Sequence, residues 1–341
     1  MSFSSTLLQW YDRYGRDLPW RHTRDAYAIW LSEVILQQTR IDQGRDYWLR
    51  FMQQWPDVHQ LAKATEDQVM RQWQGLGYYS RARNLLKAAK AIDEMGRFPS
   101  TYSDLLKLKG VGPYTAAAVA SLAFDEDVAV VDGNVYRVLA RHFGIKTAIN
   151  TTEGVKEFRQ LAQALMPKGK AAAYNQALMD FGAICCTPSH PCCDNCPLAD
   201  SCTALLNGNV QQLPVKQRKT VIKERHIDYV YIRCQGLTAL HRRQPGDIWQ
   251  GLWEPFCIEP GGVQPLPLPP GKGTLHLVRS NIRHQLTHRL IISNFYLWEA
   301  EDHPTLPPDY QWIAEQDIDL YGKPRLVELM LEEINSEAIE A

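Results

Sequence analysis

The stretch LLKLKGVGPYTAAAVASLAFDEDVAVVDGNVYR, residues 105–137, indicates the fold of the first part of this chain. A short amphipathic helix is expected to end in a turn at Gly110, Val111 and Gly112. Pro113 then opens a second helix, where its missing N–H costs nothing. Glycines can adopt positive φ or let another backbone approach closely, and amides at such a turn, beside a helix N-terminus, can hold one phosphate.

The same stretch places a carboxylate at the start of a third helix. A short apolar run, Val128 to Val131, ends at Asp132, and the residues that follow have helical spacing. The residues expected on one face of this helix are Val135, Val138, Leu139 and His142. A glycine turn alone is a weak indicator of nucleic-acid binding, but the turn, Asp132 and the cysteines described below together indicate it strongly.

Length and charge limit the possible classes of protein. The chain has 341 residues, enough for two domains with their own cores. Its formal net charge is −1, so DNA contacts must come from a local arrangement of Arg, Lys and backbone amides rather than from an overall positive field. It has no apolar run of about 18 residues, and residues 1–10 lack a secretory signal, so we expect a cytoplasmic protein without a membrane partner.

The periodicity of the sequence changes near residue 205. Helical patterns dominate residues 3–200, which predicts an all-α domain over 1–204. They include one helix that carries Ile29 to Gln38 and others at roughly 41–54, 65–73, 79–95, 153–166 and 171–184. Residues 205–225 are polar, basic and interrupted by Pro214, as in a linker. Short β-branched and aromatic runs, with a final helix over about 324–336, predict an α+β domain over 226–341.

Six of the eight cysteines lie between Cys185 and Cys202. A disulfide framework would spread its cysteines along the chain, so this clustering indicates a metal site in a reducing compartment. The pattern Cys186-x6-Cys193-x2-Cys196-x5-Cys202 fits an iron–sulfur cluster or a tetrahedral zinc. Zinc usually prefers two C-x2-C pairs and only one is present, so a 4Fe–4S cluster is favoured. On spacing alone, Cys185 and Cys192 could substitute as ligands.

Three motifs together resemble the helix–hairpin–helix DNA glycosylases that carry an iron–sulfur cluster. They are the hairpin LKGVGPYT, the segment VVDGNVYRV and the cysteine spacing. Within that superfamily, WLSEVILQQTR (Trp30–Arg40) and GLGYYSRARNL (Gly75–Leu85) resemble the adenine DNA glycosylases of the MutY type. The resemblance covers nearly the whole chain. It implies base-excision repair, in which adenine mispaired with 8-oxoguanine, or with guanine, is removed from double-stranded DNA.

Cleavage of an N-glycosidic bond calls for two carboxyl groups with different tasks, an acid for the departing base and a negative charge near the oxocarbenium-like sugar. Glu33 is the candidate acid, because apolar neighbours in its helix would raise its pKa. Asp132 is the candidate stabiliser, because a helix N-terminus and nearby amides should keep it ionised. We thus expect the two pKa values to move in opposite directions. The alternatives are a solvated surface position for Glu33 and a plain N-cap for Asp132.

The resemblance assigns roles to these residues and their neighbours. Glu33 would protonate adenine at N7, Asp132 would stabilise the cationic sugar, and Asn134 would position Asp132 and the attacking water. Tyr114 occupies the place where related strand-cutting enzymes carry a lysine that forms a Schiff base, and a phenol cannot do so. Tyr114 therefore predicts base excision without strong lyase activity, unless it is only a packing aromatic.

Adenine must leave the duplex before an acid can reach it. By resemblance, Gln38 and Tyr78 are wedge residues, meaning side chains that fill the space left by the extruded base. The residues matching the base pocket of the family are Trp20, Arg21 and Gln176. A basic helical stripe is formed by Arg81, Arg83 and Lys87, and it either follows phosphates or is an ordinary solvated face.

The second domain resembles a Nudix fold, but residues after Gly262 read VQPLPLPPG where Nudix hydrolases have an acidic, magnesium-binding helix. Pyrophosphohydrolase activity is therefore not expected. Thr287 and His288 match a Phe-Ser-His loop that inspects 8-oxoguanine, with Leu286 in place of the aromatic residue. Alternatively, both residues simply end a strand.

Two other functions are less consistent with the sequence than an adenine glycosylase. An endonuclease III-like glycosylase/lyase for oxidised pyrimidines is disfavoured by Tyr114 and by the second domain. A non-catalytic protein that binds damaged DNA is disfavoured by the presence of both Glu33 and Asp132. We expect a bacterial, monomeric enzyme that acts at the nucleoid.

Overall fold

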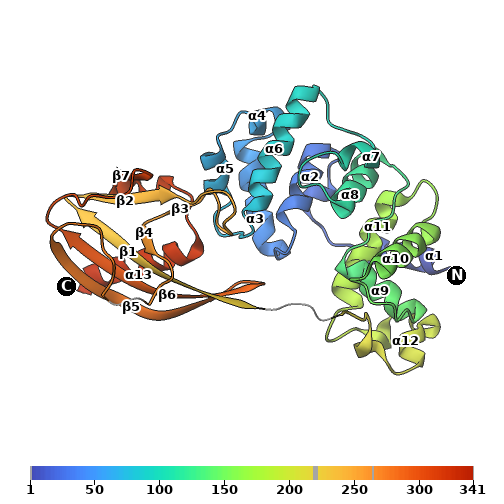
Figure 1. The fold of residues 1–341 in the computed structure, drawn as a ribbon. Helices are drawn as coiled ribbons and strands as arrows, with labels where there is room; N and C mark the ends of the chain where they lie inside the picture. The colour runs from blue at the N-terminus through green and yellow to red at the C-terminus, as the bar shows by residue number, and fades with distance from the viewer. Residues whose placement is uncertain (1, 218–221, 263–264, 341) are drawn as a thin grey trace. The chain divides into compact units, whose positions relative to one another are not determined.

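The computed structural model describes residues 2–217, 222–262 and 265–340. Residues 218–221, inside the predicted linker 205–225, and residues 263–264, in the proline-rich tract, lie outside that description. The chain divides into two compact units, Met1–Lys63 with Asn84–Arg218 and Ala64–Arg83 with Lys219–Ala341 (Figure 1). The segment Ala64–Arg83 therefore groups with the C-terminal residues, although it lies between two parts of the first unit in the sequence.

The first unit is all-α, as predicted. Its helices are α1 (Phe3–Tyr14), α2 (Ala26–Ile35), α3 (Ile41–Gln54), α4 (Val58–Ala62), most of α6 (Ser80–Met95), α7 (Tyr102–Leu105), α8 (Pro113–Phe124), α9 (Gly133–Phe143), α10 (Thr152–Leu165), α11 (Ala171–Asp180) and α12 (Thr203–Leu206). Among the described residues, no helix is long and apolar enough to cross a bilayer.

Helix α2 is buried on every side, because all ten of its residues, including Glu33, are shielded from solvent. Its apolar residues allow this burial, and it packs against α8, which is similarly apolar. The Asp25 carboxylate caps its N-terminus by accepting a hydrogen bond from the Tyr27 amide at 2.9 Å. The helix ends at Ile35, so the prediction that it extends to Gln38 is wrong: Gln38 has a φ of +60°, which a continuing helix does not permit.

The C-terminal part of the second unit is α+β, as predicted, and contains one seven-stranded sheet. Its strands are β1 (Lys223–Cys234), β2 (Leu237–Arg242), β3 (Trp253–Glu254), β4 (Phe256–Ile258), β5 (Gly273–Gln285), β6 (Arg289–Ala300) and β7 (Tyr310–Ala314). The main order is β3-β2-β1-β6-β5, with β4 paired to β1 and β7 paired to β2. The β1–β6 pair is parallel and the others are antiparallel.

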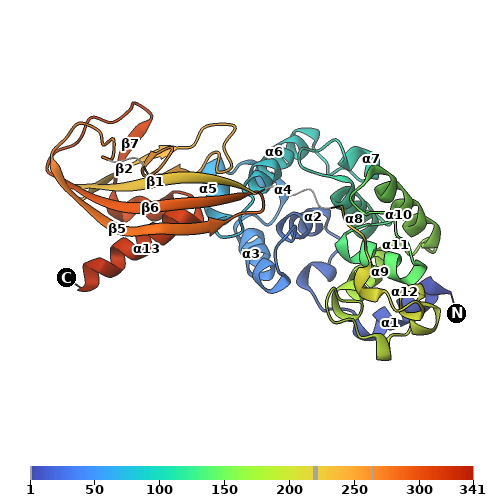
Figure 2. The ribbon, with the colours of Figure 1, turned by 60° about the horizontal axis from the view of Figure 1, so that its bottom comes forward.

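Helix α13 (Arg325–Glu340) packs beside β5, and Figure 2 shows it lying along the sheet. The final helix is thus confirmed. Strands β5 and β6 form a hairpin whose turn is closed by the Leu286 amide, which donates to the Arg289 carbonyl at 2.8 Å. Thr287 and His288 lie in this turn, beyond the strand ends.

Candidate active site

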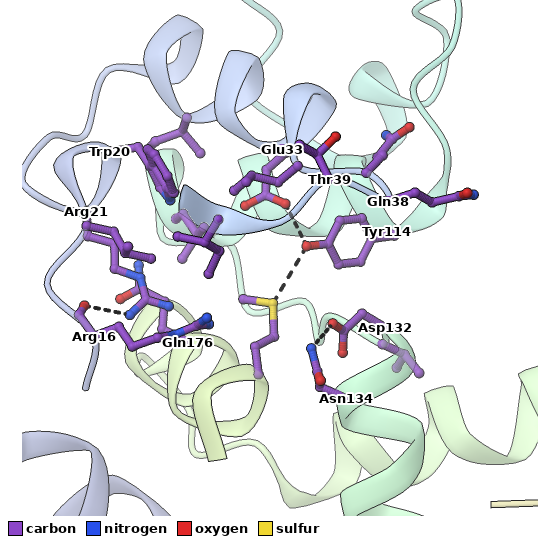
Figure 3. Close-up of a pocket in the computed structure, with 18 residues that line it drawn as sticks. Arg16, Trp20, Arg21, Glu33, Gln38, Thr39, Tyr114, Asp132, Asn134 and Gln176 are labelled. Atoms are coloured by element: carbon purple, nitrogen blue, oxygen red, sulfur yellow. Dashed lines mark hydrogen bonds between the residues drawn. The ribbon is translucent and has the colours of Figure 1, made fainter. Parts of the chain in front are cut away.

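A cavity of about 380 Å³ opens in the first unit, a size typical of small-ligand sites (Figure 3). Its walls come from α2, the turn after α2, the 3-10 turn Pro19–Arg21, α8, α9 and α11. The residues predicted for catalysis (Glu33, Tyr114, Asp132 and Asn134) and for the base pocket (Trp20, Arg21 and Gln176) all line it, together with the predicted wedge residue Gln38. Residues far apart in the sequence are thereby brought to one place.

Glu33 is a buried acid with one hydrogen-bond donor beside it. Its side chain projects from α2, the residue is 7% exposed, and the Tyr114 hydroxyl donates to its Oε2 at 2.6 Å. Burial raises the pKa of Glu33 from 4.5 to about 7, although the Tyr114 hydrogen bond favours the ionised form. A carboxyl group with this pKa can hold a proton near neutral pH and give it up, as a general acid must. The alternative of a solvated surface carboxylate is wrong.

Asp132 is the N-cap of α9, as its position before a helical pattern indicated. Its carboxylate accepts from the Val135 amide and from the Asn134 side-chain amide, each at 2.8 Å. Burial nevertheless raises the pKa of Asp132, and these hydrogen bonds lower it only in part. The expectation that the pKa values of Glu33 and Asp132 move in opposite directions is therefore wrong, since burial of the cavity acts on both.

Tyr114 is more than a packing aromatic. Its hydroxyl contacts Glu33 and lies 3.7 Å from the Met179 sulfur. Figure 3 shows Tyr114 beside Glu33, and Asp132 beside Asn134, as two hydrogen-bonded pairs facing the cavity. Asn134 is itself held by the Arg137 guanidinium, which donates to its Oδ1 at 2.8 Å. Its backbone lies close to Gly182, where an added Cβ would come within 2.6 Å of the Asn134 Cβ.

One buried residue of this site, Asp180, was missed by sequence reasoning. Its side chain is fully shielded, and both carboxylate oxygens accept from the Arg21 guanidinium at 2.7 Å. Arg16 donates to the same carboxylate through its backbone amide and Nε, each at 2.8 Å. Burial would raise the pKa of Asp180, but the hydrogen bonds from both arginines hold it below its ordinary value. Asp180 thus fixes Arg21 at the cavity wall. The sequence holds no local signal for this pair, because Arg21 and Asp180 are 159 residues apart.

Trp20 and Gln176 complete the wall of the cavity. Trp20 is 6% exposed and packs edge-on against Trp48, with ring centroids 5.8 Å apart. The Tyr11 hydroxyl donates to the Gln176 Oε1 at 2.5 Å, which leaves the amide nitrogen of Gln176 as the group available to donate.

The predicted phosphate-binding turn has the expected positive φ at Gly110 but not at Gly112, whose φ is −90°. Gly110 has a φ of +80°, and a Cβ there would lie 2.5 Å from the Asn84 Cβ, so only glycine fits. Gly112 is the N-cap of α8. The Val111 amide donates to the Leu108 carbonyl at 3.2 Å and is therefore already paired. The phosphate-binding role of the turn stays a prediction.

The wedge residues Gln38 and Tyr78 lie in different units, and both are exposed residues in the left-handed region, with φ of +60° and +46°. Within the second unit, the Tyr78 hydroxyl forms a hydrogen bond with the Thr287 hydroxyl. Two residues predicted for different tasks, base extrusion and inspection of the opposite base, are therefore in contact. His288 follows Thr287 in the same hairpin turn and is exposed.

In the basic stripe, Arg81 is buried and Arg83 half-buried, whereas Lys87 is exposed to solvent. Arg81 is 9% exposed, and its guanidinium donates to the carbonyls of Leu76 and Gly77 at 3.1 and 3.3 Å. Burial lowers the pKa of Arg81 to about 10. Arg83 donates to the Gln250 carbonyl. Arg81 therefore supports the turn that carries Tyr78.

The cysteine loop lies against two buried arginines. The Arg141 guanidinium approaches the Cys186 sulfur at 3.5 Å and donates to the carbonyls of Thr187 and Pro188, while Arg137 donates to the Cys186 carbonyl at 2.7 Å. Among the described residues, no three of these thiols lie within 4.8 Å of one another. A single zinc with Zn–S bonds of about 2.3 Å needs sulfurs about 3.8 Å apart. The two cationic side chains beside these sulfurs are compatible with a metal cluster held by thiolates.

Two family models match parts of this chain. A family model described as HhH-GPD superfamily base excision DNA repair protein matches residues 31–168, and one described as NUDIX domain matches residues 228–333. The solved structure of a thermostable thymine-DNA glycosylase superposes with a TM-score of 0.56 and is 35% identical, over 60% of this chain and 95% of that one.

Two curated relatives carry the same protein name. The adenine DNA glycosylase of Buchnera aphidicola subsp. Schizaphis graminum is 35% identical over 259 residues, which cover 75% of this chain and 74% of that protein. The adenine DNA glycosylase of Mus musculus is 44% identical over 227 residues, 62% of this chain and 44% of the mouse protein, so the match spans less than half of that longer relative. The prediction made from the motifs is confirmed: the chain belongs to the adenine DNA glycosylase family.

Proposed function

We propose that this enzyme acts in base-excision repair on double-stranded DNA in which adenine is mispaired with 8-oxoguanine or with guanine. It hydrolyses the bond between adenine N9 and the C1′ of deoxyribose and does not cut the strand. The observation that carries the proposal is that Glu33, with a pKa of about 7, and Asp132 line one cavity. The names of the relatives supply the target base, and the cavity supplies the chemistry.

Glu33 is the acid of this mechanism. Because the Tyr114 hydroxyl donates to Oε2, the other oxygen is free to carry the acidic proton. Transfer of that proton to adenine N7 makes the base a better leaving group. The electron pair of the N9–C1′ bond then leaves with adenine, and positive charge develops on the sugar.

Asp132 stabilises that positive charge. Its carboxylate is held by the Val135 amide and the Asn134 side chain, so it needs no reorganisation when the charge develops. A water adds at C1′, and its proton passes to a carboxylate of the site. Tyr114 has no amine with which to form a Schiff base, which supports hydrolysis without strand cleavage. An endonuclease III-like lyase would need an amine at this position, and Tyr114 does not supply one.

The other predicted residues bind the DNA. Gly110 and Gly112 hold a backbone phosphate, with Val111 as the packed residue of the turn. Gln38 and Tyr78 fill the vacated stack, and the adenine is held by the pocket residues Trp20, Arg21 and Gln176. Thr287 and His288 inspect the opposite base, with Leu286 supplying no aromatic stacking.

The domain organisation and the cofactor belong to the same proposal. The glycosylase domain comprises residues 1–204, the linker 205–225 and the Nudix-like domain 226–341. A 4Fe–4S cluster is held by Cys186, Cys193, Cys196 and Cys202. When bound, the cluster supplies four metal–thiolate bonds that hold the loop in place. Arg141 and Arg137 orient that loop through its carbonyls, and equimolar loss of iron and acid-labile sulfide in a Cys196→Ser variant would test this ligand.

The test uses duplexes with adenine opposite 8-oxoguanine, guanine or thymine, incubated with enzyme and then treated with hot alkali. We expect strand breaks at the adenine only after alkali, and only opposite 8-oxoguanine or guanine. Glu33→Gln should lower the single-turnover rate by at least about 100-fold. Glu94→Gln, on the exposed side of α6, is the matched control and should react at the wild-type rate. Breaks at an unchanged rate with Glu33→Gln would remove Glu33 from the role of acid.

A further inference from the structure

The segment Ala64–Arg83 carries the wedge residue Tyr78 and belongs to the same compact unit as the C-terminal domain. It contains helix α5 (Glu66–Gln72), the turn at Gly75–Tyr78 and the first residues of α6. More than 130 residues separate it from the strands and helix that it contacts. Besides the contact of Arg83 with Gln250, two groups of contacts join the segment to the C-terminal domain.

The first group joins the start of α5 to strands β2 and β3. The Arg242 guanidinium lies 3.1 Å from a Glu66 carboxylate oxygen and 3.3 Å from one of Asp67. The Trp253 indole N–H points to the same Asp67 carboxylate at 3.5 Å. One arginine therefore holds two neighbouring carboxylates of the first helical turn.

The second group joins the end of the segment to helix α13 and the residues before it. The Gln74 amide donates to the Glu328 carboxylate, and the Tyr79 hydroxyl donates to the Lys323 carbonyl at 3.2 Å. Gly322 lies so close to Met70 that a Cβ there would be 3.3 Å from the Met70 Cβ. Helix α5 is thus fastened at both ends to the C-terminal domain.

Between these two groups, the turn itself is held in an unfavourable backbone conformation. Tyr78 has a φ of +46°, which non-glycine residues adopt only when their surroundings impose it. Arg81 imposes it from within the segment, because its guanidinium binds the carbonyls of Leu76 and Gly77 and lies 5.0 Å from the Trp73 ring. The shape of the turn is therefore set locally, while its location is set by the C-terminal domain.

The position of the turn determines which residues the Tyr78 side chain contacts. Its hydroxyl is bonded to Thr287 in the β5–β6 turn, and its ring is 47% exposed. A single hydrogen bond at an exposed tip cannot fix the relative position of two loops, because water competes for both hydroxyls. The contacts between α5 and the C-terminal domain must therefore fix the position of the Tyr78 turn relative to the Thr287 turn.

We propose that Arg242 and Glu328 are positioning residues that set the preference of the enzyme for 8-oxoguanine over guanine. They act through α5, by holding Tyr78 against the Thr287 turn, so that the loop that inspects the opposite base and the side chain that fills the stack work as one body. The inference rests on the proposed function, in which Tyr78 and Thr287 have these roles.

The test measures single-turnover rates of adenine release opposite 8-oxoguanine and opposite guanine, and compares the ratio of the two rates among variants of the full chain. Arg242→Gln and Glu328→Gln should each lower this ratio by about threefold, the effect expected for partly exposed ionic contacts. Combining Arg242→Glu with Glu66→Arg reverses the pair and should restore part of the ratio that Arg242→Glu alone loses.

Arg233→Gln is the matched control. Arg233 is also a partly exposed arginine of the C-terminal domain, and it pairs with Glu315 at 3.0 Å, away from α5. This variant should keep the wild-type ratio. A wild-type ratio in both Arg242→Gln and Glu328→Gln would overturn the proposal, and so would an equal loss of both rates, because that result indicates a general effect on folding. If the wild-type enzyme itself releases no adenine opposite 8-oxoguanine, the proposed function fails instead.

Discussion

Replacing Glu33 by glutamine should stabilise the protein while it abolishes catalysis. Burial raises the pKa of Glu33 from 4.5 to about 7, which means that the fold resists ionisation of this side chain. At about 1.4 kcal/mol for each tenfold change in the acid constant, the ionised carboxylate costs the folded state about 3 kcal/mol. Glutamine has the same shape, cannot ionise, and can still accept the hydrogen bond from Tyr114.

The sign of the effect depends on pH. Below pH 4.5 Glu33 is protonated in both the folded and the unfolded chain, so its burial carries no ionisation cost. Between pH 4.5 and 7 the unfolded chain ionises first, and the stability of the wild type falls relative to the variant. Above pH 7 the difference is constant. The free energy of unfolding of Glu33→Gln should therefore exceed that of the wild type by about 1 kcal/mol at pH 5 and about 3 kcal/mol at pH 8.

The assay is urea unfolding of both proteins at pH 5 and pH 8, followed by far-ultraviolet circular dichroism, which reports chiefly on the helical unit. Glu94→Gln removes an exposed carboxylate from the same unit and should show the same difference from the wild type at both pH values. If the gain in Glu33→Gln is equal at pH 5 and pH 8, or absent at both, burial does not hold a proton on Glu33. The assignment of this residue as the acid would then lose its physical basis.

Three further predictions concern the neighbours of Glu33. Tyr114→Phe removes a hydrogen bond that favours the ionised form, so the pKa of Glu33 rises above about 7, and adenine release should persist to a pH about one unit higher than in the wild type; a pH–rate profile that moves the other way contradicts this. Asp132→Asn should lower the single-turnover rate by at least about 100-fold while a gel-shift assay still detects DNA binding, and loss of binding instead would make Asp132 a structural cap. Asp180→Asn leaves the Arg21 guanidinium without its buried partner and should cost about 3–5 kcal/mol in urea unfolding, so a loss below about 1 kcal/mol would contradict the role of this carboxylate.

Local signals in the sequence were sufficient for most of the helix ranges, whereas most of the residues that line the cavity were predicted through the resemblance to a family. Helix α3 occupies the predicted range 41–54. Helix α9 starts after its Asp132 cap and ends at Phe143, where Gly144 is the C-cap with a φ of +69°. Such limits depend on neighbouring residues, so a single sequence contains them. Helix α11 differs, because it was expected to reach residue 184 but ends at Asp180 and continues as a π turn over Phe181–Cys185.

Contacts between residues far apart in the sequence could not be predicted from local patterns. Asp180 binds Arg21, 159 residues earlier, and no local pattern joins them. The grouping of Ala64–Arg83 with the C-terminal domain likewise depends on contacts such as Arg242 with Glu66. The burial of a side chain also depends on distant residues, because it is set by whatever packs around that side chain. For this reason the pKa of Asp132 is raised by burial, although its position at a helix N-terminus predicted a lowered pKa.

The rise of both pKa values leaves one question about the mechanism, namely what assigns the proton to Glu33 rather than to Asp132. Burial cannot do so, because both carboxyl groups share the cavity. The hydrogen bonds differ: Asp132 accepts from a backbone amide and from the Asn134 side chain, whereas a single hydroxyl donates to Glu33. Donors favour the ionised form, so the group with more of them keeps the charge. The division of labour between acid and stabiliser therefore follows from the N-cap geometry of α9 and from the Arg137 contact that holds Asn134 in place.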